Sequence, residues 1–159
     1  MRRILLDTHT FIWLDLEPVK LSIDCQNLLL DRENILLLSL ASVWEMQIKY
    51  QLGKLTLRLP LPALIEEQQQ INNIQLLPIE LNHLWTLNRL ENHHRDPFDR
   101  LLIAQAIAED VSILSDDGLF DRYPVQRLWE WATTSENSTA NEPVESAIHV
   151  KNYTLQLPS

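Results

Sequence analysis

Short apolar runs alternate with longer segments of mixed character along most of the chain. The apolar runs that predict buried strands lie at residues 3–6, 36–38, 75–79, 112–115 and 125–128. The longer segments carry apolar residues at helical spacing and predict helices at residues 10–14, 23–31, 62–72, 80–90 and 97–109, with a further helix that ends at residue 52. Because strands alternate with helices, the pattern indicates parallel βαβ units and an α/β fold.

The helix predicted at residues 97–109 opens with two carboxylates. Asp96 suits the N-cap position, where a carboxylate accepts hydrogen bonds from free backbone N–H groups, and Pro97 then occupies the first helical position. Asp99 stands three residues after Asp96, where a capping box places an acid. Most of the following residues are apolar, so the helix should be largely buried. The two acids either cap the helix or hold a ligand.

The helix that ends at residue 52 has signals at both ends. Ser39 or Ser42 can cap its start, and Gly53 stops it. Its expected core-facing stripe consists of the apolar residues that recur every four positions, Trp44, Ile48 and Leu52.

Further acids stand where predicted strands end. Asp7 follows the strand at residues 3–6, and Asp117 follows the apolar run that ends at Ser115. Open parallel sheets bind ligands at this carboxyl edge. Together with Glu45 and Asp99, which lie on two predicted helices, these acids could converge on one edge of the sheet.

Each of these acids also has a purely structural interpretation. Asp7 can cap the helix that follows it, and Glu45 can form an ion pair with Lys49 one turn later. Asp117 can be a turn residue. Asp116 competes with Asp117, because a shift of one residue decides which side chain points inward.

Composition and charge limit the classes of function. The 159 residues are enough for one domain with a proper core, and 45% of them are hydrophobic. A net charge of −9 argues against sequence-independent binding of nucleic acid through a basic surface, but it is compatible with a carboxylate cluster that holds divalent cations. The single Cys25 allows no internal disulfide, and no apolar segment is long enough for a membrane span or a signal peptide. These features favour a cytoplasmic protein.

Four motifs, in this order, resemble those of PIN-domain proteins, and most of all the VapC-type toxin ribonucleases of bacterial toxin–antitoxin systems. The motifs are Leu6-Asp7-Thr8, Trp44-Glu45-Met46-Gln47-Ile48-Lys49, His94-Arg95-Asp96-Pro97-Phe98-Asp99-Arg100-Leu101-Leu102-Ile103-Ala104 and Ser115-Asp116-Asp117. The resemblance covers residues 1–131 and implies a PIN-like α/β/α sandwich with a mostly parallel sheet of about five short strands. It also implies a ribonuclease that depends on Mg²⁺ or Mn²⁺, is often a homodimer, cleaves RNA and is silenced by a cognate antitoxin protein.

The resemblance also assigns roles to individual residues. It implies that Asp7 and Asp99 are the strongest metal ligands, while Glu45 and Asp117 complete a second site or orient water. Mg²⁺ and Mn²⁺ are hard cations that prefer oxygen ligands, and two of them can stabilise the charge that develops when a phosphodiester is hydrolysed. The neighbours that could orient these ligands are Thr8, Asp96, Ser115 and Asp116. The basic residues that could contact RNA phosphates are Lys49, Lys54, Arg95 and Arg100.

Two other functions compete with this one. A catalytically silent PIN fold could act as a protein- or RNA-binding module, but such a relative would be free to lose one of its acids. A phosphatase of the haloacid dehalogenase type needs an Asp two residues after its nucleophile, and position 9 is His. The five histidines have no spacing typical of a zinc site and are expected to be structural or on the surface.

The composition changes after residue 131. Residues 132–147 are mostly polar and could be disordered, while residues 148–157 carry apolar side chains among polar ones and could be a docking segment or a simple tail. The resemblance does not extend to this C-terminal extension. It does imply an apolar groove for an antitoxin, and the candidate groove residues are Phe11, Ile12, Trp13, Leu14, Trp44 and Ile48.

Overall fold

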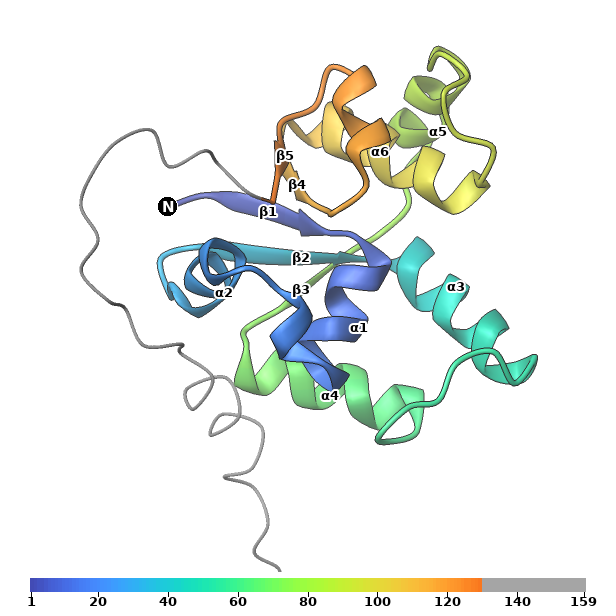
Figure 1. Cartoon of the computed structure of the whole chain (residues 1–159). Helices are drawn as coiled ribbons and strands as arrows, with labels where there is room; N and C mark the ends of the chain where they lie inside the picture. Colours follow the sequence, from blue (N-terminus) through green and yellow to red (C-terminus); the bar gives the residue numbers. More distant parts are fainter. Residues whose placement is uncertain (130–159) are drawn as a thin grey trace, which may run out of the picture.

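The central element of the fold is a five-stranded, all-parallel sheet (Figure 1). The computed structural model describes residues 1–129 of the chain. The strands are β1 (Arg3–Leu6), β2 (Ile35–Ser39), β3 (Gln75–Leu77), β4 (Ser112–Leu114) and β5 (Arg127–Leu128), and they lie in the order β3-β2-β1-β4-β5. The order reverses direction at β1, so the carboxyl end of β1 lies at the point where ligands bind in doubly wound sheets.

Helices flank the sheet on both sides and complete the α/β/α sandwich that the sequence predicts (Figure 1). The α-helices are α1 (Thr8–Leu16), α2 (Ile23–Leu30), α3 (Leu40–Gln51), α4 (Leu61–Ile71), α5 (Leu81–Asn88) and α6 (Pro97–Glu109), and the 3₁₀ helices are η1 (Pro18–Lys20) and η2 (Gly118–Arg122). No helix among residues 1–129 is long and apolar enough to cross a membrane.

Alternation along the strands divides the core into two layers. In β1, Ile4 and Leu6 face the layer formed with α1, α2 and α4, whereas Leu5 faces the layer formed with α6. All three side chains are fully buried. A strand that is buried on both faces is continuously apolar, which is why β1 reads as an unbroken hydrophobic run.

Local signals account for most element boundaries. Asp7 and Ser22 accept backbone N–H groups at the starts of α1 and α2, and Ser39 does so at the start of α3. The cap at Asp7 starts α1 earlier than the apolar pattern alone predicts. Strand β3 ends sooner than predicted, before Pro78, because proline has no N–H to donate to a neighbouring strand.

One prediction for α3 is wrong. Trp44 and Leu52 do not face the core, since 58% of Trp44 and 63% of Leu52 are exposed. The buried face carries Ala41, Ser42, Glu45 and Met46 instead. Successive residues lie about 100° apart around a helix, so neighbouring positions face different sides. Because Ser42 and Glu45 lie on the inner face of α3, the large side chain of Trp44 points outward.

Two further predictions concern the candidate groove residues, which the structure describes, and the C-terminal extension, which it does not. Among the candidate groove residues, Phe11 and Leu14 belong to the core, while Ile12 and Trp13 are half-buried against it. The C-terminal extension at residues 132–159, with its proposed docking segment at 148–157, lies outside the described residues.

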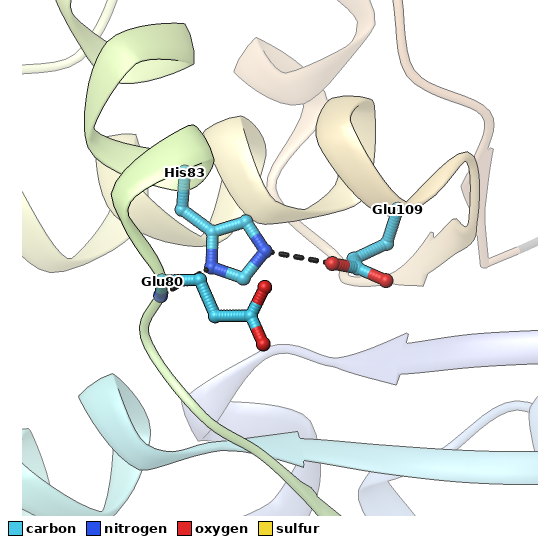
Figure 2. Close-up of side chains that lie close together, drawn as sticks. All are labelled: Glu80, His83 and Glu109. Carbon is cyan, nitrogen blue, oxygen red and sulfur yellow. Dashed lines mark hydrogen bonds and ion pairs between the residues drawn. The ribbon is translucent and has the colours of Figure 1, made fainter.

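A buried histidine ties α5 to α6 (Figure 2). Nδ1 of His83 accepts the backbone N–H of Glu80 at 3.0 Å, and its Nε2 lies 2.8 Å from Oε1 of Glu109 at the end of α6. Because Nδ1 is an acceptor, Nε2 carries the proton and donates it to Glu109. Both ring nitrogens therefore have protein partners, and the side chain of His83 joins the start of α5 to the end of α6.

Candidate metal centre

Asp7 lies at the carboxyl end of β1 and is almost completely buried. One carboxylate oxygen accepts the backbone N–H of Thr8 at 2.7 Å, and the other accepts the hydroxyl of Ser115 at 2.7 Å. Asp7 therefore caps α1, as its structural interpretation predicts. A cap does not exclude a second role, because each carboxylate oxygen has a further lone pair.

Glu45 projects from the inner face of α3 and is also buried. The hydroxyl of Thr8 donates to its Oε1 at 2.9 Å and lies within hydrogen-bonding distance of Ser42, also at 2.9 Å. Nζ of Lys49 lies 2.6 Å from Oε2 of Glu45. The predicted ion pair between Glu45 and Lys49 thus exists. The Glu45 carboxylate nevertheless faces the interior, where it lies beside Thr8, the neighbour of Asp7 in the chain.

The two acids at the start of α6 differ in their surroundings. Asp96 is exposed and caps the helix, since its Oδ1 accepts the N–H groups of Phe98 at 2.8 Å and Asp99 at 3.4 Å. Asp99 lies on the first turn and is half-buried. The cap predicted for Asp96 is confirmed.

Asp117 approaches Asp99 from the loop after β4. Its Oδ1 accepts the N–H of Leu119 at 2.9 Å, and its Oδ2 lies 2.8 Å from Nε2 of His94. Asp116 is exposed and has no such contact among the described residues. Of the two competing aspartates, Asp117 is therefore the one that faces the other acids.

Ser115 connects two of the acids. Its hydroxyl donates to Asp7, and its oxygen accepts the backbone N–H of Asp117 at 3.1 Å. Thr8 makes the corresponding connection between the start of α1 and Glu45. Both hydroxyls thus hydrogen-bond to carboxylates of the site, and their expected role in orienting metal ligands stays a prediction.

Burial and neighbouring negative charges raise the pKa values of Asp7 and Asp99. Burial is the main cause of the raised pKa of Asp7, and the negative charge of Glu45 adds to it. Burial also raises the pKa of Asp99 to about 7, with further contributions from the charges of Asp7, Asp96, Glu45 and Asp117. The site therefore concentrates negative charge that the protein alone does not neutralise.

The carboxylates of Asp99 and Asp117 are close enough together to share a cation. One ligand atom each from His94, Asp99 and Asp117 lie within 4.8 Å of one another. Carboxylate oxygens are the ligands that Mg²⁺ and Mn²⁺ prefer, and the excess negative charge favours a dication at this point. The residues fit a divalent metal ion.

His94 is the residue at this site that the sequence did not identify. It is buried, and its partners Asp117 and Tyr123 follow it by 23 and 29 residues. No short motif connects residues at such separations, and a pair of adjacent histidines has no ligand spacing of its own.

The four basic residues that could contact RNA differ in their exposure and in their partners. Lys49 is paired with Glu45, and Nη1 of Arg100 donates to the backbone carbonyl of Glu91 at 2.9 Å. Lys54 and Arg95 are exposed. Contact between these side chains and RNA remains a prediction.

Comparison with known proteins gives a family match and several similar folds. A family model described as the PIN domain matches residues 4–126. The structure resembles VapBC2 from Rickettsia felis bound to a DNA fragment from its promoter, with 15% sequence identity and a TM-score of 0.63 over 80% of this chain and 99% of that one. DNA-bound VapBC from Salmonella typhimurium is similar at 14% identity and a TM-score of 0.59, covering 80% and 98%. FitAcB from Neisseria gonorrhoeae follows at 17% identity and a TM-score of 0.51, covering 78% and 95%. A search of curated proteins gives no match.

At these identities the structural likeness is evidence for the fold alone. The family match spans well over half of the chain and includes Asp7, Glu45, Asp99 and Asp117. The chain therefore belongs to the PIN domain family.

Proposed function

We propose that this protein is an endoribonuclease that uses divalent cations and acts as the toxin of a toxin–antitoxin pair. The observation that carries the proposal is the convergence of carboxylates from separate elements around Asp99, whose pKa is raised to about 7 by burial and by the neighbouring acids. Folding keeps these charges together at a cost in stability, which is typical of a functional site.

The acids would hold Mg²⁺ or Mn²⁺, with Asp7 and Asp99 as the main ligands and Glu45 and Asp117 at a second position. When bound, such cations lower the pKa of water and stabilise the charge on the attacking and leaving oxygens. Ser115 and Thr8 contribute by orienting Asp7 and Glu45 through their hydroxyl groups. Lys49 neutralises part of the charge of Glu45.

A catalytically silent binding module is the alternative. It has no need for the acids Asp7 and Asp99, whose pKa values burial raises, because a neutral residue of the same size would cost less to bury at these two positions. The retention of all four acids supports catalysis over binding alone.

The structural neighbours support an antitoxin as the protein partner, since two of them are VapBC complexes. Large apolar side chains on the surface, among them Trp44, Leu52 and Trp85, offer area for protein contacts. A homodimer and an antitoxin complex are both proposed, and light scattering with and without the candidate antitoxin would distinguish them.

RNA cleavage tests the proposal directly. The full chain is incubated with a mixture of single-stranded and structured RNA in Mg²⁺, in Mn²⁺ and in EDTA. We expect cleavage that EDTA abolishes, loss of cleavage in Asp99→Asn, and normal cleavage in the matched control Asp116→Asn, whose side chain is exposed. RNA binding without cleavage in any metal would instead favour the binding module.

A further inference from the structure

His94 lies in the loop before α6 and is packed between aromatic rings. Its ring stacks on Tyr123 at a centroid distance of 5.5 Å and an interplanar angle of 27°, and it contacts Phe120 at 4.9 Å. All but 8% of the residue is buried. This packing fixes the plane of the imidazole, so its two nitrogens point to defined partners.

Hydrogen bonds at Tyr123 determine which nitrogen of His94 carries a proton. The phenol oxygen accepts the backbone N–H groups of His93 at 3.2 Å and of His94 at 2.9 Å. These two bonds use both of its lone pairs, so the hydroxyl hydrogen remains to be donated. Its partner is Nδ1 of His94 at 3.2 Å. Nδ1 is therefore an acceptor, and Nε2 carries the hydrogen that it donates to Asp117 at 2.8 Å.

This proton arrangement is incompatible with a metal bond to His94. Nε2 could bind a cation only as the unprotonated nitrogen, and the hydrogen would then lie on Nδ1. There it would face a phenol oxygen whose lone pairs are already occupied by the two N–H groups. Buried donors without acceptors are costly, so the short distance from His94 to Asp99 and Asp117 does not make it a ligand.

We propose that His94 is a positioning residue that holds Asp117 through an Nε2–H donor, with Tyr123 fixing the tautomer. Asp117 is then held at both oxygens, Oδ1 by the N–H of Leu119 and Oδ2 by His94. A fixed carboxylate loses less freedom when it binds a cation, so its affinity is higher. The proposal rests on the metal-dependent function, and it concerns how one ligand is oriented.

Nuclear magnetic resonance of the metal-free full chain tests the tautomer without reference to activity. With ¹⁵N-labelled histidine at about pH 8.5, where an ordinary imidazole is neutral, we expect the His94 proton on Nε2. Addition of Mg²⁺ should leave that proton in place. A proton on Nδ1, or loss of the Nε2 proton when Mg²⁺ is added, would overturn the proposal.

Metal affinity tests the positioning role. We expect His94→Leu to weaken Mn²⁺ binding, measured by calorimetry on the full chain, by about 10- to 100-fold. His94→Gln should recover most of this loss, because the Gln amide places an N–H group near the position of Nε2. Equal Mn²⁺ affinity in His94→Leu and the wild type would overturn the proposal, and so would equal losses in the Leu and Gln variants.

The same measurements separate this proposal from the proposed function. If the wild type binds Mn²⁺ and shows the expected tautomer but does not cleave RNA, the nuclease function fails and the role of His94 stands. If the wild type cleaves RNA and His94→Leu changes neither metal affinity nor the metal concentration needed for half-maximal rate, the role of His94 fails alone.

Discussion

Ser115 donates a hydrogen bond of 2.7 Å to Asp7, although 108 positions separate the two residues. They meet because β1 and β4 are adjacent and parallel, with Leu6 paired to Leu114 just before them. Since the oxygen of Ser115 also accepts the N–H of Asp117, one hydroxyl aligns acids from two strand ends. The parallel pairing of two strands thus assembles the site.

Removal of this hydroxyl should weaken metal binding. In Ser115→Ala the carboxylate of Asp7 loses a partner that orients it, so we expect Mn²⁺ affinity to fall by about 10- to 100-fold. Ser112→Ala is the matched control, because Ser112 lies on the same strand and its hydroxyl donates to Gln126 at the surface. Calorimetry on both variants provides the measurement, and equal affinities would show that Ser115 is only structural.

Asp7→Asn should abolish RNA cleavage while the fold is retained. The amide matches the carboxylate in shape but is a poor ligand for a hard dication, and a loss of about 3 kcal/mol or more corresponds to at least about a 100-fold lower rate. The amide can accept only one of the two hydrogen bonds that Asp7 accepts, but removal of a buried charge should offset this loss, so the metal-free variant should melt close to the metal-free wild type at neutral pH. Wild-type cleavage by this variant would refute a metal role for Asp7.

Substitutions of the two acids at the start of α6 should have different effects, one on stability and the other on activity. Asp96→Ala removes the cap of the helix and should cost about 0.5–2 kcal/mol of unfolding free energy. Asp99→Ala should lower the cleavage rate with a smaller effect on stability, since Asp99 does not cap the helix. Thermal melts and rates on both variants decide the matter, and a cleavage defect confined to Asp96→Ala would reverse the assignment.

The raised pKa of Asp99 predicts how pH affects metal binding. At pH 6, below its pKa of about 7, most Asp99 is protonated and must lose a proton to bind a cation. We expect Mn²⁺ affinity to be about tenfold weaker at pH 6 than at pH 8, with release of protons on binding. Calorimetry in buffers of different ionisation enthalpy measures the protons released. No release at pH 6 would contradict the prediction.

The same group affects the stability of the metal-free protein. Its pKa of about 7 lies above the ordinary value of 3.8, so the folded state binds more protons than the unfolded state between these values. The contribution of Asp99 to stability is therefore greatest at low pH and is lost as pH rises towards 7. Asp99→Asn should melt higher than the wild type at pH 8, and the gain should disappear near pH 4.

A stability prediction away from the site concerns Arg58 and Asp15. The Asp15 carboxylate is buried, and one oxygen accepts hydrogen bonds from Arg58 at 2.9 Å and Gln68 at 3.1 Å. Arg58→Ala leaves that charge without its cation and should cost on the order of 3 kcal/mol in chemical denaturation. Glu67→Gln removes the other, more exposed partner of Arg58 and should cost far less.

The sequence by itself determined the order of the elements and the helix caps. The D-P pair at Asp96 and Pro97 predicts the start of α6 at its observed position, because a cap and a proline act on the backbone within one turn. Apolar runs likewise predict the strands, because a strand that is buried on both faces of the sheet is apolar at every position. Asp7 and Asp117 could be placed at one sheet edge because parallel strands carry their carboxyl ends to the same side.

Only the tertiary structure decided which side chains meet at that edge. The outward position of Trp44 and the inward position of Glu45 depend on a rotation of α3 that its mixed apolar pattern does not specify. The choice between Asp116 and Asp117 depends on the contact with His94. That contact joins residues 23 positions apart in the chain, and its geometry is set by packing against rings from another part of the fold. Local preferences act over a few residues, whereas orientation at the site is a property of the packed core.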